Sequence, residues 1–305
     1  MLIGLMVESK NLSPLHKHYK SLQVFFSMVK EVAIVYPVAG LSSRFGGKIK
    51  QFARIGPNGE TLIEYSLKQS TKAGFSKIIF IVSEKTERIF KIMLGDRFRG
   101  IPIEYVLQEF DSKERDKPWG TAEAVCCTKD FLDCPFVFCN GDDIYGENTF
   151  KILFNHLQES EESATIGYEL IDVIPEEGSV HRGIFKTNEK GYVKKLIETF
   201  DIEKEKLDEK NLKEDSLCSM NLFALYPEVI EELNKRLIKF KLDNKGDRKI
   251  EFLIPREISR LVEEKRIKMK IYHTPDKWFG VTNPEDEEIV RELLKNNNLL
   301  TPKTY

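Results

Sequence analysis

The sequence predicts an α/β fold built on a doubly wound, mostly parallel sheet, followed by a smaller β-rich region. Two observations lead to this prediction. From Glu31 to about Phe154, short and nearly continuous apolar segments alternate with amphipathic segments, which is typical of parallel strands covered by helices on both faces. After Phe154, strand-like segments follow one another closely, which indicates a second region rich in strands.

In the first half, strands are expected where apolar residues run together and helices where apolar residues recur with a helical period. The predicted strands are residues 32–38, 77–83, 103–108 and 135–140, and the predicted helices are residues 62–74, 84–94 and 120–132. Ligands of such sheets lie beyond the carboxyl ends of the strands. Binding residues are therefore expected directly after these strands.

The second half has its own pattern. A turn at Glu189-Lys190-Gly191 predicts a hairpin, and the dense mixed charge of residues 201–215 predicts a solvated loop or a short surface helix. The remaining predictions are strands at 164–170, 183–188, 191–199, 219–226 and 268–273, helices near 228–239 and 250–264, and a closing helix from Pro284.

Composition limits the function classes. The 305 residues are 41% hydrophobic and 31% charged, with a net charge of −2, which indicates a globular protein and argues against non-specific nucleic-acid binding. No apolar run reaches the roughly 18 residues that a membrane span needs. The five cysteines are odd in number and lack a C-x-x-C spacing, which favours reduced thiols in a cytoplasmic protein. Residues 1–27 are predicted to be a poorly ordered extension of a domain at 28–305.

The first predicted strand runs into a glycine-rich, basic loop, PVAGLSSRFGGKIKQF, at residues 37–52. Its glycines allow main-chain N–H groups to face a phosphate, and Arg44 and Lys50 supply fixed positive charge. The loop therefore predicts polyphosphate binding, although any strand with a glycine-rich turn has a similar composition. The spacing is not that of a P-loop, and it gives little support to a dinucleotide-binding site.

This loop, P-x-A-G-x-x-x-R-x-G-G followed by Lys50-Gln51, resembles the nucleotidyltransferase family, which joins a nucleoside triphosphate to a sugar 1-phosphate or related phosphate. Three later segments, IGPNGE, KPWGT and KWFGVT, resemble a subgroup of that family in the same order. The resemblance covers roughly residues 31–288. It implies a GT-A-like nucleotidyltransferase fold, with a nucleotide half at about 31–154 and an acceptor half at about 155–290.

The resemblance also implies roles for the loop residues. Arg44 and Lys50 are the predicted catalytic residues: Arg44 would hold the leaving pyrophosphate, and Lys50 would stabilise charge growing at the α-phosphate. Ala39 and Gly40 are predicted to contact the nucleotide. None of the five histidines lies in a motif, so no general base is predicted.

Asn140-Gly141-Asp142-Asp143 follows the apolar strand PFVFC. Adjacent carboxylates repel each other unless a cation or hydrogen bonds neutralise them. Mg²⁺ would do so, because it prefers one or two carboxylates together with phosphate oxygens and water. The resemblance implies Asp142 as the metal ligand. A plain turn of the same composition is the alternative.

A segment at residues 105–125 is the predicted base-binding part. A strand ends at Gln108, and Trp119-Gly120-Thr121 opens a helix, where free N–H groups and a glycine would let a flat base approach the backbone. The resemblance implies nucleotide contacts from Gln108, Gly120 and Thr121. A capped helix packed by Trp119 explains the same residues structurally.

The acceptor residues implied by the resemblance are Glu198, at the end of YVKKLIE, and Asn221, in SMNLFALY. A lone glutamate in a surface strand is also commonly just solvated. Relatives usually carry a second metal-binding Asp where this chain has Gly280. Whether Asp143 or another group replaces it is left open.

The combined prediction is an Mg²⁺-dependent enzyme that transfers a nucleotidyl group from an NTP to a sugar 1-phosphate or similar small phosphorylated acceptor. A cytidylyltransferase for a polyol or amino-alcohol phosphate is an alternative, since Lys50-Gln51-Phe52 resembles that branch too. A GT-A glycosyltransferase would not need Arg44 and Lys50 so close together. A non-catalytic nucleotide-binding regulatory homologue fits less well with Arg44, Lys50 and Asp142 intact. The sequence does not determine the base, the acceptor or the oligomeric state. A homo-oligomer is one of the states left open.

Overall fold

The computed structural model describes residues 29–40, 49–176, 178–281 and 286–295. The chain divides into an N-terminal unit, Met1–Lys30, and a much larger compact unit, Glu31–Tyr305. All helices and strands below belong to the second unit. No helix in the described ranges is long and apolar enough to cross a membrane.

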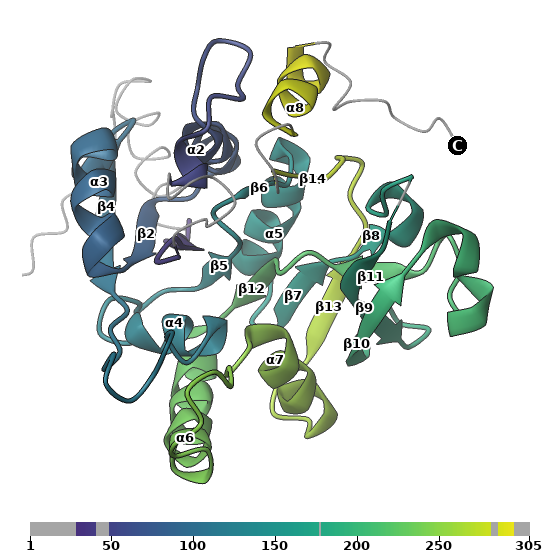
Figure 1. Cartoon of the computed structure of the whole chain (residues 1–305). Coiled ribbons are helices and arrows are strands. Elements are labelled where there is room, and N and C mark those ends of the chain that lie inside the picture. Colours follow the sequence, from purple (N-terminus) through teal and green to yellow (C-terminus); the bar gives the residue numbers. More distant parts are fainter. Residues whose placement is uncertain (1–28, 41–48, 177, 282–285, 296–305) are drawn as a thin grey trace, which may run out of the picture. The chain divides into compact units, whose positions relative to one another are not determined.

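The first half of the second unit alternates strands and helices, as predicted (Figure 1). A capping box starts α2, since the Thr61 side chain accepts a hydrogen bond from the Glu64 N–H while the Glu64 carboxylate accepts one from the Thr61 N–H. The elements are β1 (Ala33–Pro37), η2 (Lys50–Phe52), α2 (Leu62–Ala73), β2 (Lys77–Val82), α3 (Glu84–Leu94), β3 (Arg97–Phe98), β4 (Ile101–Leu107), α4 (Thr121–Cys127), β5 (Phe136–Phe138), β6 (Asp143–Ile144) and α5 (Glu147–Glu159).

The second half contains the predicted hairpin, because β9 and β10 pair antiparallel. The charged run forms two 3-10 turns, η4 and η5. The elements are β7 (Ser163–Ile166), β8 (Tyr168–Glu169), η3 (Leu170–Asp172), β9 (Val180–Thr187), β10 (Val193–Ile202), η4 (Lys204–Lys206), η5 (Asp208–Lys210), β11 (Leu217–Ser219), β12 (Phe223–Leu225), α6 (Pro227–Asp243), α7 (Ile254–Glu263), β13 (Met269–Tyr272), β14 (Phe279–Gly280) and α8 (Asp286–Lys295).

The central sheet has eight strands in the order β13-β7-β12-β5-β1-β2-β4-β3. The pairings of β1 with β2 and β5, of β2 with β4 and of β7 with β13 are parallel, whereas β12 and β3 run antiparallel to their neighbours. The predicted mostly parallel sheet is therefore confirmed. Three strands that follow Phe154 also belong to the central sheet, namely β7, β12 and β13. Phe154 therefore does not mark a boundary between the two sheets. Strands β8 to β11 form the separate four-stranded sheet.

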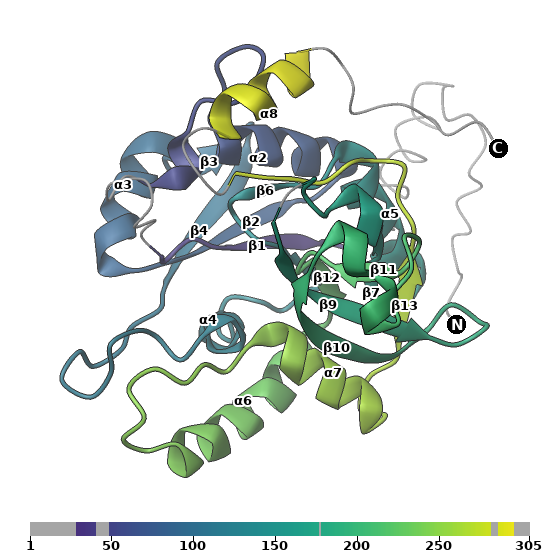
Figure 2. The ribbon, with the colours of Figure 1, turned by 45° about the vertical axis from the view of Figure 1, so that its right-hand side comes forward.

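Both faces of the central sheet are covered, which is the doubly wound arrangement (Figure 2). Along β1, Ile34 and Tyr36 belong to one apolar core, and Ala33 and Val35 belong to the other. Because side chains alternate between the faces of a strand, β1 is buried on both sides. The first core includes residues of α2, α3 and α5, and the second includes residues of α4, α6 and α7.

Two sequence predictions differ from the structure. Helix α5 is not among the predicted helices, yet its buried Phe150, Leu153 and Leu157 recur at helical spacing, so its periodicity could have predicted it. The single strand predicted at 219–226 is wrong. It is two strands, β11 in the small sheet and β12 in the central sheet, separated at Asn221, whose φ is +57°. An asparagine tolerates this left-handed conformation better than most residues do.

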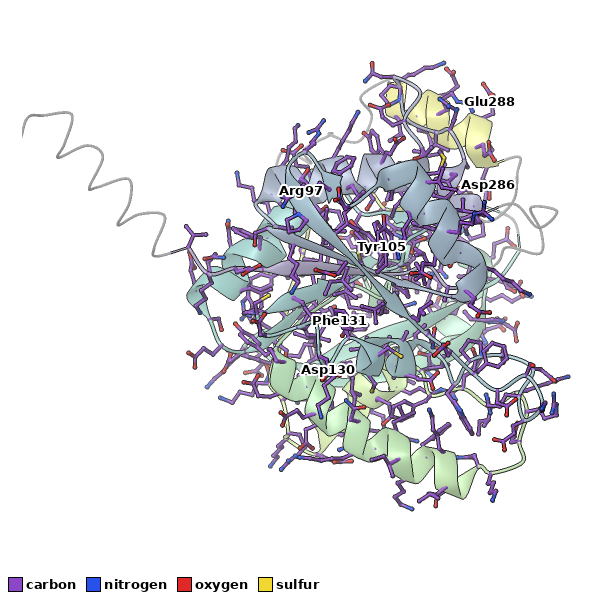
Figure 3. The ribbon with its side chains drawn as sticks, turned by 90° about the vertical axis from the view of Figure 1, so that its left-hand side faces the viewer. Arg97, Tyr105, Asp130, Phe131, Asp286 and Glu288 are labelled. Atoms are coloured by element: carbon purple, nitrogen blue, oxygen red, sulfur yellow. The ribbon has the colours of Figure 1, made fainter. Side chains whose placement is uncertain are left out.

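Strand β4, next to the edge strand β3, is fastened to α3. Figure 3 labels Tyr105 on β4, and its hydroxyl donates to the carbonyl oxygen of Gly95, 2.6 Å away at the end of α3. Burial raises the pKa of Tyr105 to about 12.

Candidate active site

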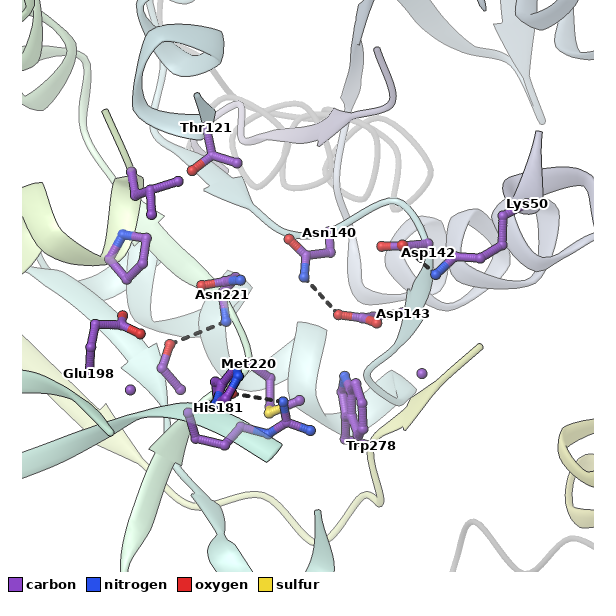
Figure 4. A pocket seen from close by; sticks show the side chains of 16 residues that line it. Lys50, Thr121, Asn140, Asp142, Asp143, His181, Glu198, Met220, Asn221 and Trp278 are labelled. Atoms are coloured by element: carbon purple, nitrogen blue, oxygen red, sulfur yellow. Dashed lines mark hydrogen bonds and ion pairs between the residues drawn. The ribbon is translucent and has the colours of Figure 1, made fainter. Parts of the chain in front are cut away.

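A cavity of about 400 Å³ lies at the edge of the central sheet where β5 ends (Figure 4). Its walls come from residues after β5, from β9 and β10 of the small sheet, and from the segment that joins β11 to β12. The structure brings five predicted site residues together around it. They are Lys50, Thr121, Asp142, Glu198 and Asn221.

Lys50 and Asp142 form an ion pair at one end of the cavity. Lys50 begins the turn η2, and its Nζ lies 2.6 Å from Asp142 Oδ2. The lysine side chain is 13% exposed and the aspartate 33%, so both can be reached from the cavity while most of the lysine is buried. The predicted cation and the predicted metal ligand therefore neutralise each other in the ligand-free chain.

Two other predicted residues of the phosphate loop are described, Ala39 and Gly40, whereas Arg44 lies outside the described residues. The carbonyl oxygen of Ala39 accepts a hydrogen bond of 2.9 Å from Ser83 Oγ. Gly40 is exposed, and no atom of the described residues lies within 4 Å of the position that a Cβ would take there. Neither Ala39 nor Gly40 is among the residues that line the cavity.

Asp143 is buried beside Asp142. Asn140 Nδ2 donates a hydrogen bond of 2.8 Å to Asp143 Oδ2, and the hydroxyl of Tyr145 lies 3.2 Å from the same oxygen. Burial and the charge of Asp142 raise the pKa of Asp143 to about 7, although Asn140, Lys50 and Trp278 act in the opposite direction. Both carboxylates line this end of the cavity. Among the described residues, no group of three or more His, Cys, Asp or Glu side chains is placed to hold a metal.

The neighbouring side chains explain why residue 280 is a glycine. In the pairing of β6 with β14, Gly280 lies opposite Asp143. A Cβ at residue 280 would lie 2.5 Å from Trp278 Cη2 and 3.3 Å from Asp143 Oδ1. The indole ring of Trp278 thus fills the space that a side chain would need, and Asp143 reaches the same place from the opposite strand.

The predicted base-binding segment is held by contacts within the chain. Gln108 is buried, and its Nε2 donates hydrogen bonds of 3.1 Å each to Gly120 O and Glu123 Oε2. Thr121 lines the cavity, and its Oγ1 accepts a hydrogen bond of 3.0 Å from Ile254 N. Gln108 itself does not line the cavity.

Packing within the chain gives a structural reason for Gly120. Its φ is +115°, and a Cβ there would lie 2.7 Å from Phe252 O. The backbone of residue 252 therefore occupies the space that a side chain at residue 120 would need. Conformation and close packing together require the glycine.

Two arginines that the sequence interpretation missed fasten this segment. Arg115 donates hydrogen bonds of 2.6 Å to both Asp247 O and Ile250 O, and its guanidinium lies 3.6 Å from the centre of the Trp119 ring. Arg248 reaches back to Asp116 at 2.8 Å. Because the hydrogen-bond and ion-pair partners are more than a hundred residues apart in sequence, no local pattern could have predicted these contacts.

The two residues predicted to bind the acceptor line the cavity with side chains that have no partner among the described residues. Glu198 and Asn221 lie on the wall away from Lys50 and Asp142 (Figure 4). Within the described ranges, neither side chain forms a hydrogen bond or an ion pair, while the Asn221 backbone N–H donates to Ser219 Oγ. Their polar atoms are therefore available to a ligand.

Residues 48–278 match the family described as Nucleotidyl transferase. The chain belongs to this family. The match covers well over half of the chain and confirms the family and the enzyme class that the motifs predict.

One curated relative of this nucleotidyl transferase matches about half of the chain at low identity. The UTP–glucose-1-phosphate uridylyltransferase AglF of Haloferax volcanii is 23% identical over 141 residues, which are 46% of this chain and 53% of that protein. The match thus spans about half the length of that relative.

Solved structures support the fold. A putative glucose-1-phosphate thymidylyltransferase from Bacillus anthracis has a TM-score of 0.63 at 13% identity. The match covers 89% of this chain and 98% of the thymidylyltransferase chain. The inositol-1-phosphate CTP transferase from T. maritima has a TM-score of 0.61 at 15% identity, covering 90% and 99%. At these identities the likeness shows the fold, and it confirms the predicted α/β class.

Proposed function

We propose that this nucleotidyl transferase moves a nucleotidyl group from a nucleoside triphosphate to a sugar 1-phosphate or a similar phosphorylated acceptor and releases pyrophosphate. The observation that carries the proposal is the Lys50–Asp142 pair, 2.6 Å apart. It lies at a cavity whose far wall presents Glu198 and Asn221, whose side chains have no partner among the described residues. A cation beside a carboxylate suits a triphosphate and its metal. A free carboxylate and amide suit the hydroxyl groups of an acceptor.

The residues at this end fit Mg²⁺. Asp142 and Asp143 supply two carboxylates side by side, and Mg²⁺ commonly takes one or two of these with phosphate oxygens and water completing its shell. Asp143, which lies opposite Gly280, would stand in for the carboxylate that relatives carry there. When bound, Mg²⁺ would neutralise charge on the triphosphate.

In the proposed reaction, Lys50 exchanges partners. Its Nζ would leave Asp142 and pair with the α-phosphate, while Arg44 would hold the departing pyrophosphate. An oxygen of the acceptor phosphate forms the new bond to the α-phosphorus, and the bond from that phosphorus to the β-phosphate bridge oxygen breaks. A phosphate is already ionised at neutral pH, so alignment and charge neutralisation suffice without a general base.

The nucleotide side is proposed to comprise Ala39, Gly40 and the segment at Gln108, Gly120 and Thr121. Among these, Thr121 lies on the cavity wall. Gln108 would act through the Gly120 carbonyl that it binds, as a positioning residue. The roles of Ala39 and Gly40 rest on their place at the end of β1.

A cytidylyltransferase for a polyol or amino-alcohol phosphate is the second candidate. Lys50-Gln51-Phe52 and the fold shared with the inositol-1-phosphate CTP transferase favour it. We also propose a cytoplasmic location, supported by five free thiols, four of them buried, which suit a reducing compartment.

The test is a thermal-shift screen of the four common NTPs with Mg²⁺, followed by an assay of pyrophosphate release with a panel of sugar and alcohol phosphates. We expect one NTP to raise the melting temperature most and to support release with one acceptor class. A neutral sugar offered in place of its phosphate is the control. Absence of pyrophosphate release with every NTP and acceptor would contradict the proposal.

A further inference from the structure

A second cavity, of about 630 Å³, lies apart from the candidate active site. Its walls are the turn of the β9–β10 hairpin, the start of β10, the end of α7 and the segment that leads into β13. Figure 2 shows α7, β10 and β13 close together. The described residues that line this cavity are all different from those that line the active-site cavity. Small-molecule sites commonly have volumes of ~300–1,000 Å³, so the space suits a small ligand.

Hydrogen bonds between neighbouring elements hold the walls of this second cavity in place. The carbonyl oxygen of Gly191 accepts a hydrogen bond of 3.0 Å from Ile271 N, which fastens the hairpin turn to β13. Ser259 Oγ accepts a hydrogen bond of 3.0 Å from Leu196 N, which fastens α7 to β10. The cavity is therefore formed in the ligand-free chain, as small-molecule sites usually are.

The pairing of β10 with β9 is irregular beside the second cavity. Val193 and Lys195 have partners on β9, but Lys194 between them has none. Consecutive side chains of a regular strand point to opposite faces, whereas both Val193 and Lys194 line the cavity. Such a bulge can re-aim a side chain. Here it adds a lysine to an otherwise apolar part of the wall.

Apolar side chains form much of the lining. Val193, Val262 and Met269 are buried, and Ile267 is half-buried. They come from β10, from α7 and from the segment that leads into β13. An apolar group that enters the cavity would be removed from water against this surface, which favours binding.

Positive charge surrounds this apolar surface. The lining includes four exposed lysines: Lys190, Lys194, Lys265 and Lys268. Among the described residues, the first three have no side-chain partner, and Lys268 lies 3.3 Å from Glu162. The acidic side chain of the lining, Glu263, is paired with Lys195 at 2.9 Å. Grouped charges of one sign raise the local concentration of the opposite ion, so the cavity favours an anion.

We infer that the second cavity binds a small organic anion with an apolar body, at a site separate from the active site. The lysines would bind the anionic group, and the apolar lining would cover the remainder of the ligand. A neutral apolar compound or a bare inorganic anion would use one of these features and would bind more weakly. The inference does not rest on the proposed function, so it stands or falls independently of pyrophosphate release.

The experiment titrates naphthalene-2-sulfonate, a planar apolar body with one anionic group, into the full chain labelled with carbon-13 at the methionine methyl groups. The Met269 methyl signal reports on the second cavity. The signal of Met220, which lines the active-site cavity, is the internal control. Naphthalene-2-methanol and inorganic sulfate are the comparison compounds, because each lacks one of the two features.

Affinities are also measured by calorimetry in the double variant Lys194→Gln/Lys265→Gln and in the matched control Lys129→Gln/Lys213→Gln. Lys129 and Lys213 are exposed, lie outside the lining and have no side-chain partner in the described part of the chain. Melting temperatures are recorded for every variant. If the first double variant fails to fold, the single variants Lys194→Gln and Lys265→Gln replace it.

We expect naphthalene-2-sulfonate to shift the Met269 signal and to leave the Met220 signal in place. The neutral alcohol and sulfate should bind at least about tenfold more weakly, because each loses either the charge or the apolar contact. Lys194→Gln/Lys265→Gln should weaken binding at least about fivefold with an unchanged melting temperature, since two exposed ion pairs are lost. The control variant should bind as the unmutated chain does.

An unshifted Met269 signal at saturating naphthalene-2-sulfonate would overturn the inference. So would equal affinities of the sulfonate and the neutral alcohol, or equal affinities of the two double variants. If an acidic peptide of alternating Glu and Leu shifts Met269 and the sulfonate does not, the cavity takes a protein partner, and the small-ligand inference is wrong.

Discussion

The two ends of the cavity use their polar side chains differently. At the end proposed to bind the nucleotide, Lys50 pairs with Asp142, and Asn140 donates to Asp143. At the end proposed to bind the acceptor, the side chains of Glu198 and Asn221 have no partner within the described residues. A ligand at the first end must replace an existing interaction, whereas at the second it replaces only water. On this proposal, the chain preorganises the nucleotide end, and the ligand completes the acceptor end.

The segment predicted to bind the base extends this contrast. Gln108 binds Gly120 and Glu123, and Glu123 in turn is paired with Lys241 at 2.6 Å. Substitutions in this segment should therefore reduce stability, while substitutions at the acceptor wall should change acceptor affinity with little effect on folding. The following predictions test that division, from the largest expected effect to the smallest.

Asp142→Asn should lower turnover at least about a hundredfold, because it removes the negative charge that would hold the metal against the triphosphate. Nucleotide binding should remain measurable, since Lys50, Arg44 and the loop amides are kept. Steady-state rates and calorimetry of Mg²⁺ with and without nucleotide check this. Tight Mg²⁺ binding should require the nucleotide.

Asp143→Asn is the companion variant for that measurement. If Asp143 is the second ligand, its loss should be nearly as damaging as that of Asp142. A small effect would show that Asp143 stabilises the turn and does not bind the metal. Full activity in excess EDTA, or an unimpaired Asp142→Asn enzyme, would remove the metal from the mechanism.

Gly120→Ala should destabilise the fold by about 2–3 kcal/mol, because it combines a strained left-handed φ with a clash against Phe252 O. Urea unfolding measures the effect. Gly95→Ala is the control for strain alone, since Gly95 also has positive φ, +69°, but nothing within 4 Å of its Cβ position. Equal losses in the two variants would mean that the close approach of residue 252 contributes nothing.

Lys50→Ala and Arg44→Ala should each reduce turnover at least about tenfold, because both act on charge that develops in the transition state. Folding should be little affected. Kinetics alongside melting curves separate the two effects. Rates like those of the unmutated enzyme in both variants would contradict the catalytic assignment of the loop.

Glu198→Gln should raise the acceptor KM severalfold through loss of charge-assisted hydrogen bonds to hydroxyl groups. The nucleotide KM and the melting temperature should not change, because the carboxylate has no partner among the described residues. Initial rates with the acceptor varied at saturating nucleotide measure this. A loss of stability without a change in acceptor KM would contradict the proposal, because it would show that Glu198 stabilises the fold and does not bind the acceptor.

Removal of residues 1–27 should leave melting temperature and activity nearly unchanged, because the first core strand begins at Ala33. Differential scanning fluorimetry and the pyrophosphate assay compare the truncated and full chains. A fall of more than ~5 °C would show that the extension packs on the core or joins subunits.

Local sequence patterns predicted much of this protein. The alternation of apolar and amphipathic segments predicted β1, β2, β4 and β5 and the helices between them, because burial on both faces leaves a direct mark on composition. The motifs after β1 and β5 predicted Lys50 and Asp142, and their contact follows from the common edge at which neighbouring parallel strands end. Periodicity alone could also have predicted α5.

Only the tertiary structure decided the remaining features, since they depend on distances between segments far apart in sequence. Gly120 is needed because the backbone of Phe252 lies against it, and Gly280 because Trp278 fills the space beside it. Asn221 marks the point where the chain passes from one sheet to the other. Sequence patterns report burial and local conformation, whereas the electrostatic partners of a side chain are set by the packing of the whole unit.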